Sequence, residues 1–120
     1  MSEFECIVVE VLEGATVVKF VDQRVMDPSR IESLGRELLS LVDASMAKGI
    51  VLNFDSVRFF SSAAINKLIK LESEIKKAGL QLRLSNLRPE VRDLFSYTNL
   101  DSLFKIKDNQ LDAIESLEGL

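Results

Sequence analysis

The segment that most constrains the fold of this chain is residues 50–69, which read IVLNFDSVRFFSSAAINKLI. Its first five residues, 50–54, are apolar enough for a buried strand and too few for a helix. A turn and a short loop follow, and apolar residues at helical spacing begin after Ser61 and Ser62. A serine just before a helical pattern can accept a hydrogen bond from a free amide of the first turn. The segment therefore predicts a strand that delivers two hydroxyl groups to the start of a helix.

The composition excludes several classes of function. The chain has 120 residues, which is the length of one domain, and we expect a single domain over residues 1–120. Its net charge is −4 and its basic residues are scattered, which argues against a nucleic-acid partner. Histidine is absent and there is one cysteine, which removes the usual zinc sites and the Ser-His-Asp and Cys-His catalytic groups. An ordinary hydrolase is therefore hard to build from these residues, and no catalytic residue or metal is expected.

The sequence also indicates a cellular compartment. No apolar run approaches the roughly 18 residues that would span a bilayer, so no membrane association is expected. The first residues lack the positive charge that opens a signal peptide. The single Cys6 cannot form an internal disulfide, which agrees with a reducing compartment. These features predict a cytoplasmic protein.

The chain opens with two predicted strands. Residues 4–12 and 15–21 are rich in valine and other residues that favour strands. Glu13 and Gly14, between them, are typical of a tight turn, so the strands should form an antiparallel hairpin. Residues 22–26 are predicted to be a polar loop.

Helices and strands alternate in the rest of the chain. A helix should begin after Asp27, its N-cap, and close at Gly49, where glycine would adopt the left-handed conformation of a helix C-cap. In the strand at 80–84, leucines alternate with Gln81 and Arg83, which should lie on an exposed face. Four helices are expected after the hairpin, at residues 28–48 and 63–78, from residue 89, and after residue 108 or 109. Three strands are expected between them, at residues 50–54, 80–84 and 103–106. This order predicts an α/β fold with four helices and a mixed, mostly parallel sheet of four to five strands.

Two stretches resemble a known family. The string VRFFSSAAI at residues 57–65 follows a strand, and it looks like the signature V-x-F-I-D-S-S-G-L-G of STAS domains. RPEVR at 88–92 and TNLDSLFKI at 98–106 are similar to the third helix of that family and to its run into the last strand. The chain thus resembles the bacterial anti-sigma factor antagonists, also called anti-anti-sigma factors, over nearly its whole length.

The resemblance implies a binding protein rather than an enzyme. In this family the unphosphorylated antagonist docks on an anti-sigma factor, often itself a serine kinase, and so frees a sigma factor. Phosphorylation of a serine at the loop–helix junction prevents docking, and a phosphatase, here expected to be of the PP2C type, reverses it. The resemblance also implies that the chain has no cofactor, and any ATP would belong to the partner kinase.

The family residues transfer to this chain only in part. Aligned without gaps, the aspartate of the motif falls on Ser61, its first serine on Ser62 and its second serine, the usual phosphoacceptor, on Ala63. The two glycines of the motif fall on Ala64 and Asn66. Ser62 is the nearest hydroxyl to the acceptor position and Ser61 the next, so phosphorylation of either is a hypothesis.

The resemblance also implies a docking surface around the junction. The residues expected to contact the partner are Arg58, Phe60, Ser61, Ser62, Ala63, Asn66 and Lys67. Phe59 is expected to pack in the core, because the family places an apolar residue there. The loop residues 22–24 can lie near the same face.

Two other interpretations remain open from the residues. In a receiver domain, Asp55 would be a phosphoacceptor at the end of a strand. Receivers, however, need acidic residues after the first strand to hold magnesium, and here that strand leads directly into another. In the second alternative the STAS fold serves as a scaffold that binds its partner without any phosphorylation. Ala63 and Ala64 favour this alternative, and the paired serines oppose it.

Overall fold

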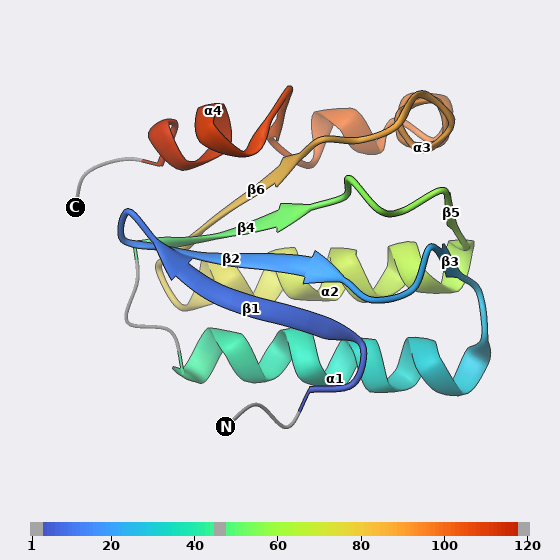
Figure 1. The fold of residues 1–120 in the computed structure, drawn as a ribbon, viewed down its shortest axis with the longest axis horizontal. Helices are drawn as coiled ribbons and strands as arrows, with labels where there is room; N and C mark the ends of the chain where they lie inside the picture. The colour runs from blue at the N-terminus through green and yellow to red at the C-terminus, as the bar shows by residue number, and fades with distance from the viewer. Residues whose placement is uncertain (1–3, 45–47, 118–120) are drawn as a thin grey trace.

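The computed structural model describes residues 4–44 and 48–117, and it contains the predicted hairpin and alternating elements (Figure 1). The main sheet has five strands in the order β1-β2-β4-β6-β7. Its pair β1 and β2 is antiparallel, and every other neighbouring pair is parallel. The predicted mixed, mostly parallel α/β fold with four helices is therefore confirmed. Its strands and helices are β1 Ile7–Leu12, β2 Ala15–Phe20, β3 Arg24–Val25, α1 Pro28–Ala44, β4 Gly49–Asn53, β5 Phe59–Phe60, α2 Ser62–Lys77, β6 Gln81–Ser85, α3 Pro89–Tyr97, β7 Ile106–Lys107 and α4 Gln110–Glu115.

The sheet lies between two layers of helices. Figure 1 shows α1 and α2 on one side and α3 and α4 on the other. Buried leucine and isoleucine side chains of β4, β6, α1 and α2 form the larger core, and residues of β2, β4 and α4 form a smaller one. Within residues 4–44 and 48–117, no helix is long and apolar enough to cross a membrane.

Local signals set several element ends as predicted. Glu13 and Gly14 both have positive φ angles, of 52° and 80°, as a two-residue hairpin loop requires. Asp27 caps α1, because its carboxylate accepts a hydrogen bond from the amide of Arg30 at 3.1 Å. Asn109 caps α4 by accepting a hydrogen bond from the amide of Asp112 at 2.8 Å.

Gly49 differs from the prediction. It is the first residue of β4, paired with Ala15 and Gln81, and not the left-handed cap of α1. A Cβ atom at this position would lie 2.7 Å from Leu117 and 2.8 Å from the Gln81 carbonyl oxygen. The backbone carbonyl of Gln81 on β6 therefore leaves no room for a side chain at residue 49, and the side chain of Leu117, which follows α4, packs into the same space. The structure describes α1 as far as Ala44, the predicted helical residues 45–47 lie outside the described residues, and Lys48, also predicted to be helical, is not in a helix.

The last part of the sheet also differs from the prediction. Instead of a strand over 103–106, the chain forms a 3₁₀ turn at Leu100–Ser102 and a strand of two residues at Ile106–Lys107. The reason is that Phe104 turns inward, where its ring lies 5.8 Å from that of Phe95. Arg83 was expected on an exposed face, but α4 covers it. Its Nε donates to the Ser116 hydroxyl at 2.8 Å and its Nη2 to the Ser116 carbonyl at 3.0 Å.

Candidate functional site

The predicted loop 22–26 and the loop after β4 pair with each other. β3 and β5 form a separate parallel two-stranded sheet, with Arg24 opposite Phe59 and Val25 opposite Phe60. The carbonyl of Gln23 accepts hydrogen bonds from the amides of Arg58 and Phe59, at 2.8 and 3.2 Å. We call this small sheet the β3–β5 ribbon. It holds the segment before α2 against the start of α1, so two loops far apart in sequence act as one surface.

The ribbon has an inner and an outer face, because side chains alternate along a strand. Val25 and Phe60 point inward and are buried. Arg24, Met26 and Phe59 point outward, and Met26 and Phe59 are 48% and 40% exposed. The Arg24 guanidinium lies 5.2 Å from the centre of the Phe59 ring, within the range of a cation–π contact. We call these three residues the outer ribbon face.

This arrangement corrects the expectation for the two adjacent phenylalanines. Phe60 was expected to contact a partner, but it is only 1% exposed and its ring packs 5.3 Å from Phe54 and 5.9 Å from Phe20. Phe59 was expected in the core and is exposed instead. Side chains alternate along β5, so only one of the two phenylalanines can face inward. The pairing of β5 with β3 decides that this is Phe60.

The two serines occupy different positions at the start of α2. Ser61 is the N-cap: its hydroxyl accepts a hydrogen bond from the amide of Ala64 at 3.2 Å, and its own amide donates to the Val25 carbonyl at 3.0 Å. Ser62 is the first helical residue, one position earlier than predicted. Its side chain is exposed, and no hydrogen bond joins its hydroxyl to another described residue. The junction therefore has one hydroxyl engaged in capping and one that faces solvent.

The other residues expected at the docking surface fall into two groups. Arg58, Ala63 and Asn66 are exposed near Ser61 and Ser62. Lys67 instead ties α2 to α1: its Nζ lies 3.0 Å from a Glu32 carboxylate oxygen, and a Cβ at position 35 would be 2.8 Å from its Cδ. A partner would have to compete with that ion pair for Lys67.

The backbone groups of Asp55 are engaged in a turn. Its amide donates to the Asn53 side chain at 2.8 Å, and its carbonyl accepts from Arg88 Nε at 2.8 Å. Residue 55 thus makes a turn that is anchored to the start of α3. In the described part of the chain, no group of three or more acidic, cysteine or histidine side chains could hold a metal ion.

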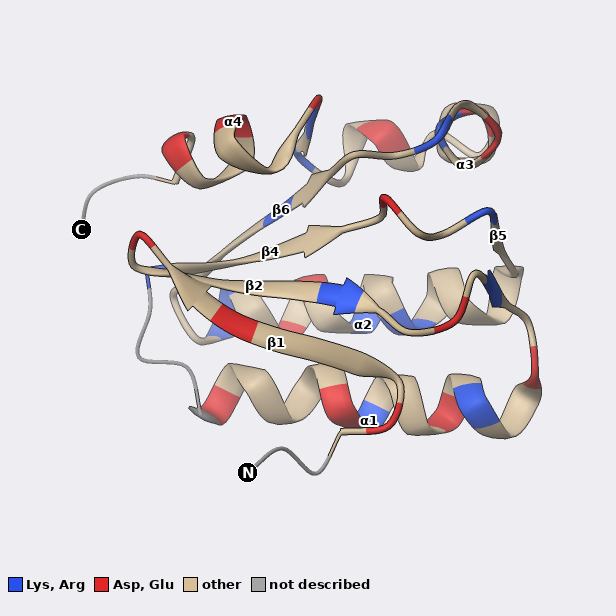
Figure 2. Cartoon of the chain, in the orientation of Figure 1, with Lys and Arg blue, Asp and Glu red and all other residues tan. Residues whose placement is uncertain are grey.

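Basic residues are present on several elements at this end of the molecule (Figure 2). Arg24 belongs to the ribbon, Arg58 directly precedes β5, and Arg88 precedes α3. The first two are exposed. The N-terminus of α2 adds the positive end of a 16-residue helix. Asp22, Asp27 and Asp55 lie on the same loops, so this end of the molecule carries charges of both signs.

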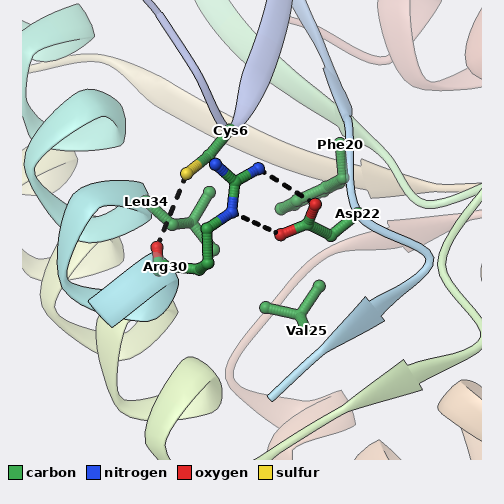
Figure 3. Close-up of a pocket in the computed structure, with 6 residues that line it drawn as sticks. All are labelled: Cys6, Phe20, Asp22, Val25, Arg30 and Leu34. Atoms are coloured by element: carbon green, nitrogen blue, oxygen red, sulfur yellow. Dashed lines mark hydrogen bonds and ion pairs between the residues drawn. The ribbon is translucent and has the colours of Figure 1, made fainter. Parts of the chain in front are cut away.

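A small cavity lies behind the ribbon, lined by Cys6, Phe20, Asp22, Val25, Arg30 and Leu34 (Figure 3). Arg30 donates to both carboxylate oxygens of Asp22, at 2.9 and 3.0 Å. The Cys6 thiol donates to the Arg30 carbonyl at 3.5 Å. Burial, and next the nearby Glu37 carboxylate, raise the pKa of Cys6 above its ordinary value. These contacts hold the end of β2 against α1.

We expect the Cys6 thiol to react slowly with alkylating reagents in the folded protein. A raised pKa leaves less thiolate at pH 8, and the thiolate is the reactive form. The rate of iodoacetamide modification should be several-fold lower in native protein than in protein unfolded in urea at the same pH. Equal rates in the two states would show that Cys6 is accessible and not held as described.

Comparison with known proteins identifies the family. The model of the STAS domain family matches residues 7–113, which includes both motifs and the ribbon. The chain belongs to the STAS domain family. A relative from Bordetella bronchiseptica, BtrV, named as an anti-sigma factor antagonist, is 25% identical over 88 residues, which cover 73% of this chain and 75% of the relative.

Solved structures share the fold of this STAS domain. An anti-sigma-factor antagonist (STAS) domain protein from Planctomyces limnophilus superposes with a TM-score of 0.81 at 20% identity, covering 93% of this chain and 97% of the other. SpoIIAA in its unphosphorylated form gives a TM-score of 0.69 at 17% identity, covering 95% of this chain and 99% of the other. SpoIIAA of Bacillus in its phosphorylated form gives a TM-score of 0.67 at 17% identity, covering 93% of this chain and 99% of the other.

Part of this surface is not predicted by the sequence. Arg24 and Met26 fall in the predicted polar loop, where no periodic pattern distinguishes them. Arg24 was included in the loop 22–24 near the partner face, but Met26 was not. The only sequence signal was the position of Val25 between Arg24 and Met26. Three residues are too few for the alternating pattern of a strand to be recognised.

Proposed function

We propose that this STAS domain is an anti-sigma factor antagonist that binds an anti-sigma factor through the outer ribbon face and the first turn of α2. The observation that carries the proposal is the exposed apolar and basic face beside the solvent-facing Ser62 hydroxyl. Names of the matching relatives support the same role. Docking would withdraw the anti-sigma factor from its sigma factor and so control transcription indirectly, in the bacterial cytoplasm, without catalysis or a cofactor of its own.

Phosphorylation is proposed to regulate this docking, with Ser62 as the acceptor and Ser61 as the alternative. Ser62 is exposed, whereas modification of Ser61 would disturb a cap that is worth about 0.5–2 kcal/mol. The structural relative SpoIIAA is described in both phosphorylated and unphosphorylated forms. The proposed partners are a serine kinase, which would also be the anti-sigma factor, and a PP2C-type phosphatase.

The physical effect of the modification follows from its position. A phosphoryl group adds roughly −1.5 to −2 charges. At the start of a helix this charge is stabilised by the dipole and by free amide groups, so the fold should persist. A partner packed over Phe59 and the first turn would have to desolvate a bulky anion. Phosphorylation would therefore reduce docking and not folding.

A pull-down from native lysate tests the proposal, with wild type, Ser62→Asp and Ser62→Ala as baits. We expect wild type and Ser62→Ala to retain a kinase-like anti-sigma factor, identified by mass spectrometry, and Ser62→Asp to lose it. Ser73→Asp is the matched control, because Ser73 is an exposed serine later on the same helix. Incubation of the retained kinase with ATP and magnesium should label wild type and not Ser62→Ala. Retention of no anti-sigma factor by any bait would contradict the proposed function.

One observation favours a second candidate function. The acceptor position of the family motif holds Ala63, which has no hydroxyl group. In this alternative the same surface binds its partner constitutively, as a scaffold or interaction module. Equal retention of one partner by wild type, Ser62→Asp and Ser62→Ala, with no labelling by the kinase, would support it.

A further inference from the structure

One pair of charged side chains ties the segment between β2 and α1 to the start of α1. Arg30, in the first turn of α1, donates from Nε and Nη2 to the two carboxylate oxygens of Asp22, at 3.0 and 2.9 Å (Figure 3). Within the described part of the chain, no other side-chain hydrogen bond or ion pair joins residues 21–26 to α1. A guanidinium that binds both oxygens of a carboxylate fixes its direction as well as its distance. This pair therefore sets the position of Asp22 relative to the helix.

Apolar packing behind the ribbon is incomplete at this point. The small cavity there has a volume of about 10 Å³, and both Asp22 and Arg30 line it. Of the two residues of β3, only Val25 faces this cavity. Atoms that line a void lose packing contacts on that side, so side-chain packing fixes the ribbon less firmly here than in a filled core. The charged pair is the directional contact that remains.

The backbone that follows Asp22 supports the proposed docking surface directly. The carbonyl of the next residue, Gln23, accepts a hydrogen bond from the amide of Phe59 at 3.2 Å. The Val25 carbonyl accepts one from the amide of Ser61 at 3.0 Å, and Ser61 is the N-cap of α2. A continuous series of contacts thus leads from α1 through residues 22–25 to β5 and the start of α2.

We propose that Asp22 and Arg30 are positioning residues for partner binding, because they hold Phe59 and the Ser61 cap in the arrangement that the partner contacts. The inference rests on the proposed function, in which the outer ribbon face and the first turn of α2 form the docking surface. A surface that is ordered before binding loses less conformational entropy when the partner docks. When the pair is broken, the ribbon samples several positions, and the affinity falls with the fraction of molecules in the one that binds.

Amide hydrogen exchange of an Asp22→Asn variant, followed by NMR, tests the positioning without any partner. The substitution keeps the shape of the side chain and removes its charge and one of its acceptor oxygens. Exchange of the Phe59 and Ser61 amides should become about tenfold faster, because loss of hydrogen bonds to a charged group favours local opening. Neither member of the pair belongs to the main sheet, so the amides of β4 should exchange as in wild type. The matched control is Asp108→Asn, the same change in an ion pair with Arg92 of α3.

A double-mutant cycle tests whether the two residues act as one unit. Arg30→Gln should raise the exchange rates of the same two amides by a similar factor. The double variant Asp22→Asn/Arg30→Gln should exchange little faster than either single variant, because removal of one partner already breaks the pair. Each of the three variants should bind the anti-sigma factor retained in the pull-down about tenfold more weakly than wild type, as measured by isothermal titration calorimetry. The affinity of Asp108→Asn should stay within about twofold of wild type, as for a residue outside the interface.

Three results would overturn the proposal. The first is unchanged exchange of the Phe59 and Ser61 amides in Asp22→Asn. The second is equally faster exchange throughout the main sheet, which would mean that the pair supports the whole fold and not the ribbon in particular. The third is faster exchange confined to the ribbon with unchanged affinity for the partner. Failure of the proposed function is a separate result, because wild type then retains no anti-sigma factor, and the positioning role in docking falls with it even if the exchange rates show that the pair holds the ribbon.

Discussion

A Phe54→Ala variant should lose about 3–5 kcal/mol of unfolding free energy, the cost of removing a buried phenylalanine side chain. Phe54 is fully buried directly after β4. Its ring lies 4.7 Å from Phe20, 5.3 Å from Phe60 and 6.2 Å from Phe95, measured between ring centres. It thus joins the sheet, the ribbon and α3, and the cavity would open among three elements. The total unfolding free energy of a domain is about 5–15 kcal/mol, so the variant should be close to unfolding.

Urea denaturation followed by circular dichroism measures this loss. The matched control is Phe59→Ala, which removes the same side chain from the exposed face of the neighbouring strand. Its unfolding free energy should change by less than about 1 kcal/mol, as is usual for exposed positions. Comparable losses in the two variants would contradict the assignment of the inner and outer faces of the ribbon.

The second large effect is expected for binding, and it rests on the proposed function. Phe59→Ala should weaken binding to the anti-sigma factor by about 30-fold or more, the effect of removing a hot-spot aromatic residue. Phe59 is an exposed aromatic ring that is held in place by the backbone pairing of β5 with β3 and by contact with Arg24. Such an ordered ring loses little conformational entropy on docking. Arg24→Ala should have a smaller effect, because an exposed cation–π contact contributes only about 0.5–1 kcal/mol.

Isothermal titration calorimetry with the purified partner measures these affinities. Tyr97→Ala is the matched control: Tyr97 is a highly exposed aromatic residue that lies on α3 outside the ribbon. Its removal should leave the affinity within about twofold of wild type, as expected for a residue outside the interface. If Tyr97→Ala weakened binding and Phe59→Ala did not, the partner would dock on α3 instead.

The sequence by itself determined the order and type of the main elements. Apolar periodicity distinguishes the helices from the strands, and Asp27, Asn109 and the Glu13–Gly14 turn mark element ends through contacts with near neighbours. These signals are local, so they are readable without the fold. The motif around residues 57–65 also located the loop–helix junction, and it identified the two hydroxyls at the start of α2.

Only the tertiary structure decided which side chains at this junction meet solvent. Phe60 lies in the core and Phe59 at the surface because of the way β5 pairs with β3. In that pairing Phe59 lies opposite Arg24, a residue 35 positions earlier in the chain. Arg83 is buried because α4, which is distant in sequence, covers its face of the sheet. Gly49 is a glycine because a Cβ atom there would lie too close to the Gln81 carbonyl of the neighbouring strand β6 and to the Leu117 side chain. Each of these outcomes depends on packing between elements far apart in the chain, and local sequence patterns carry no information about that packing.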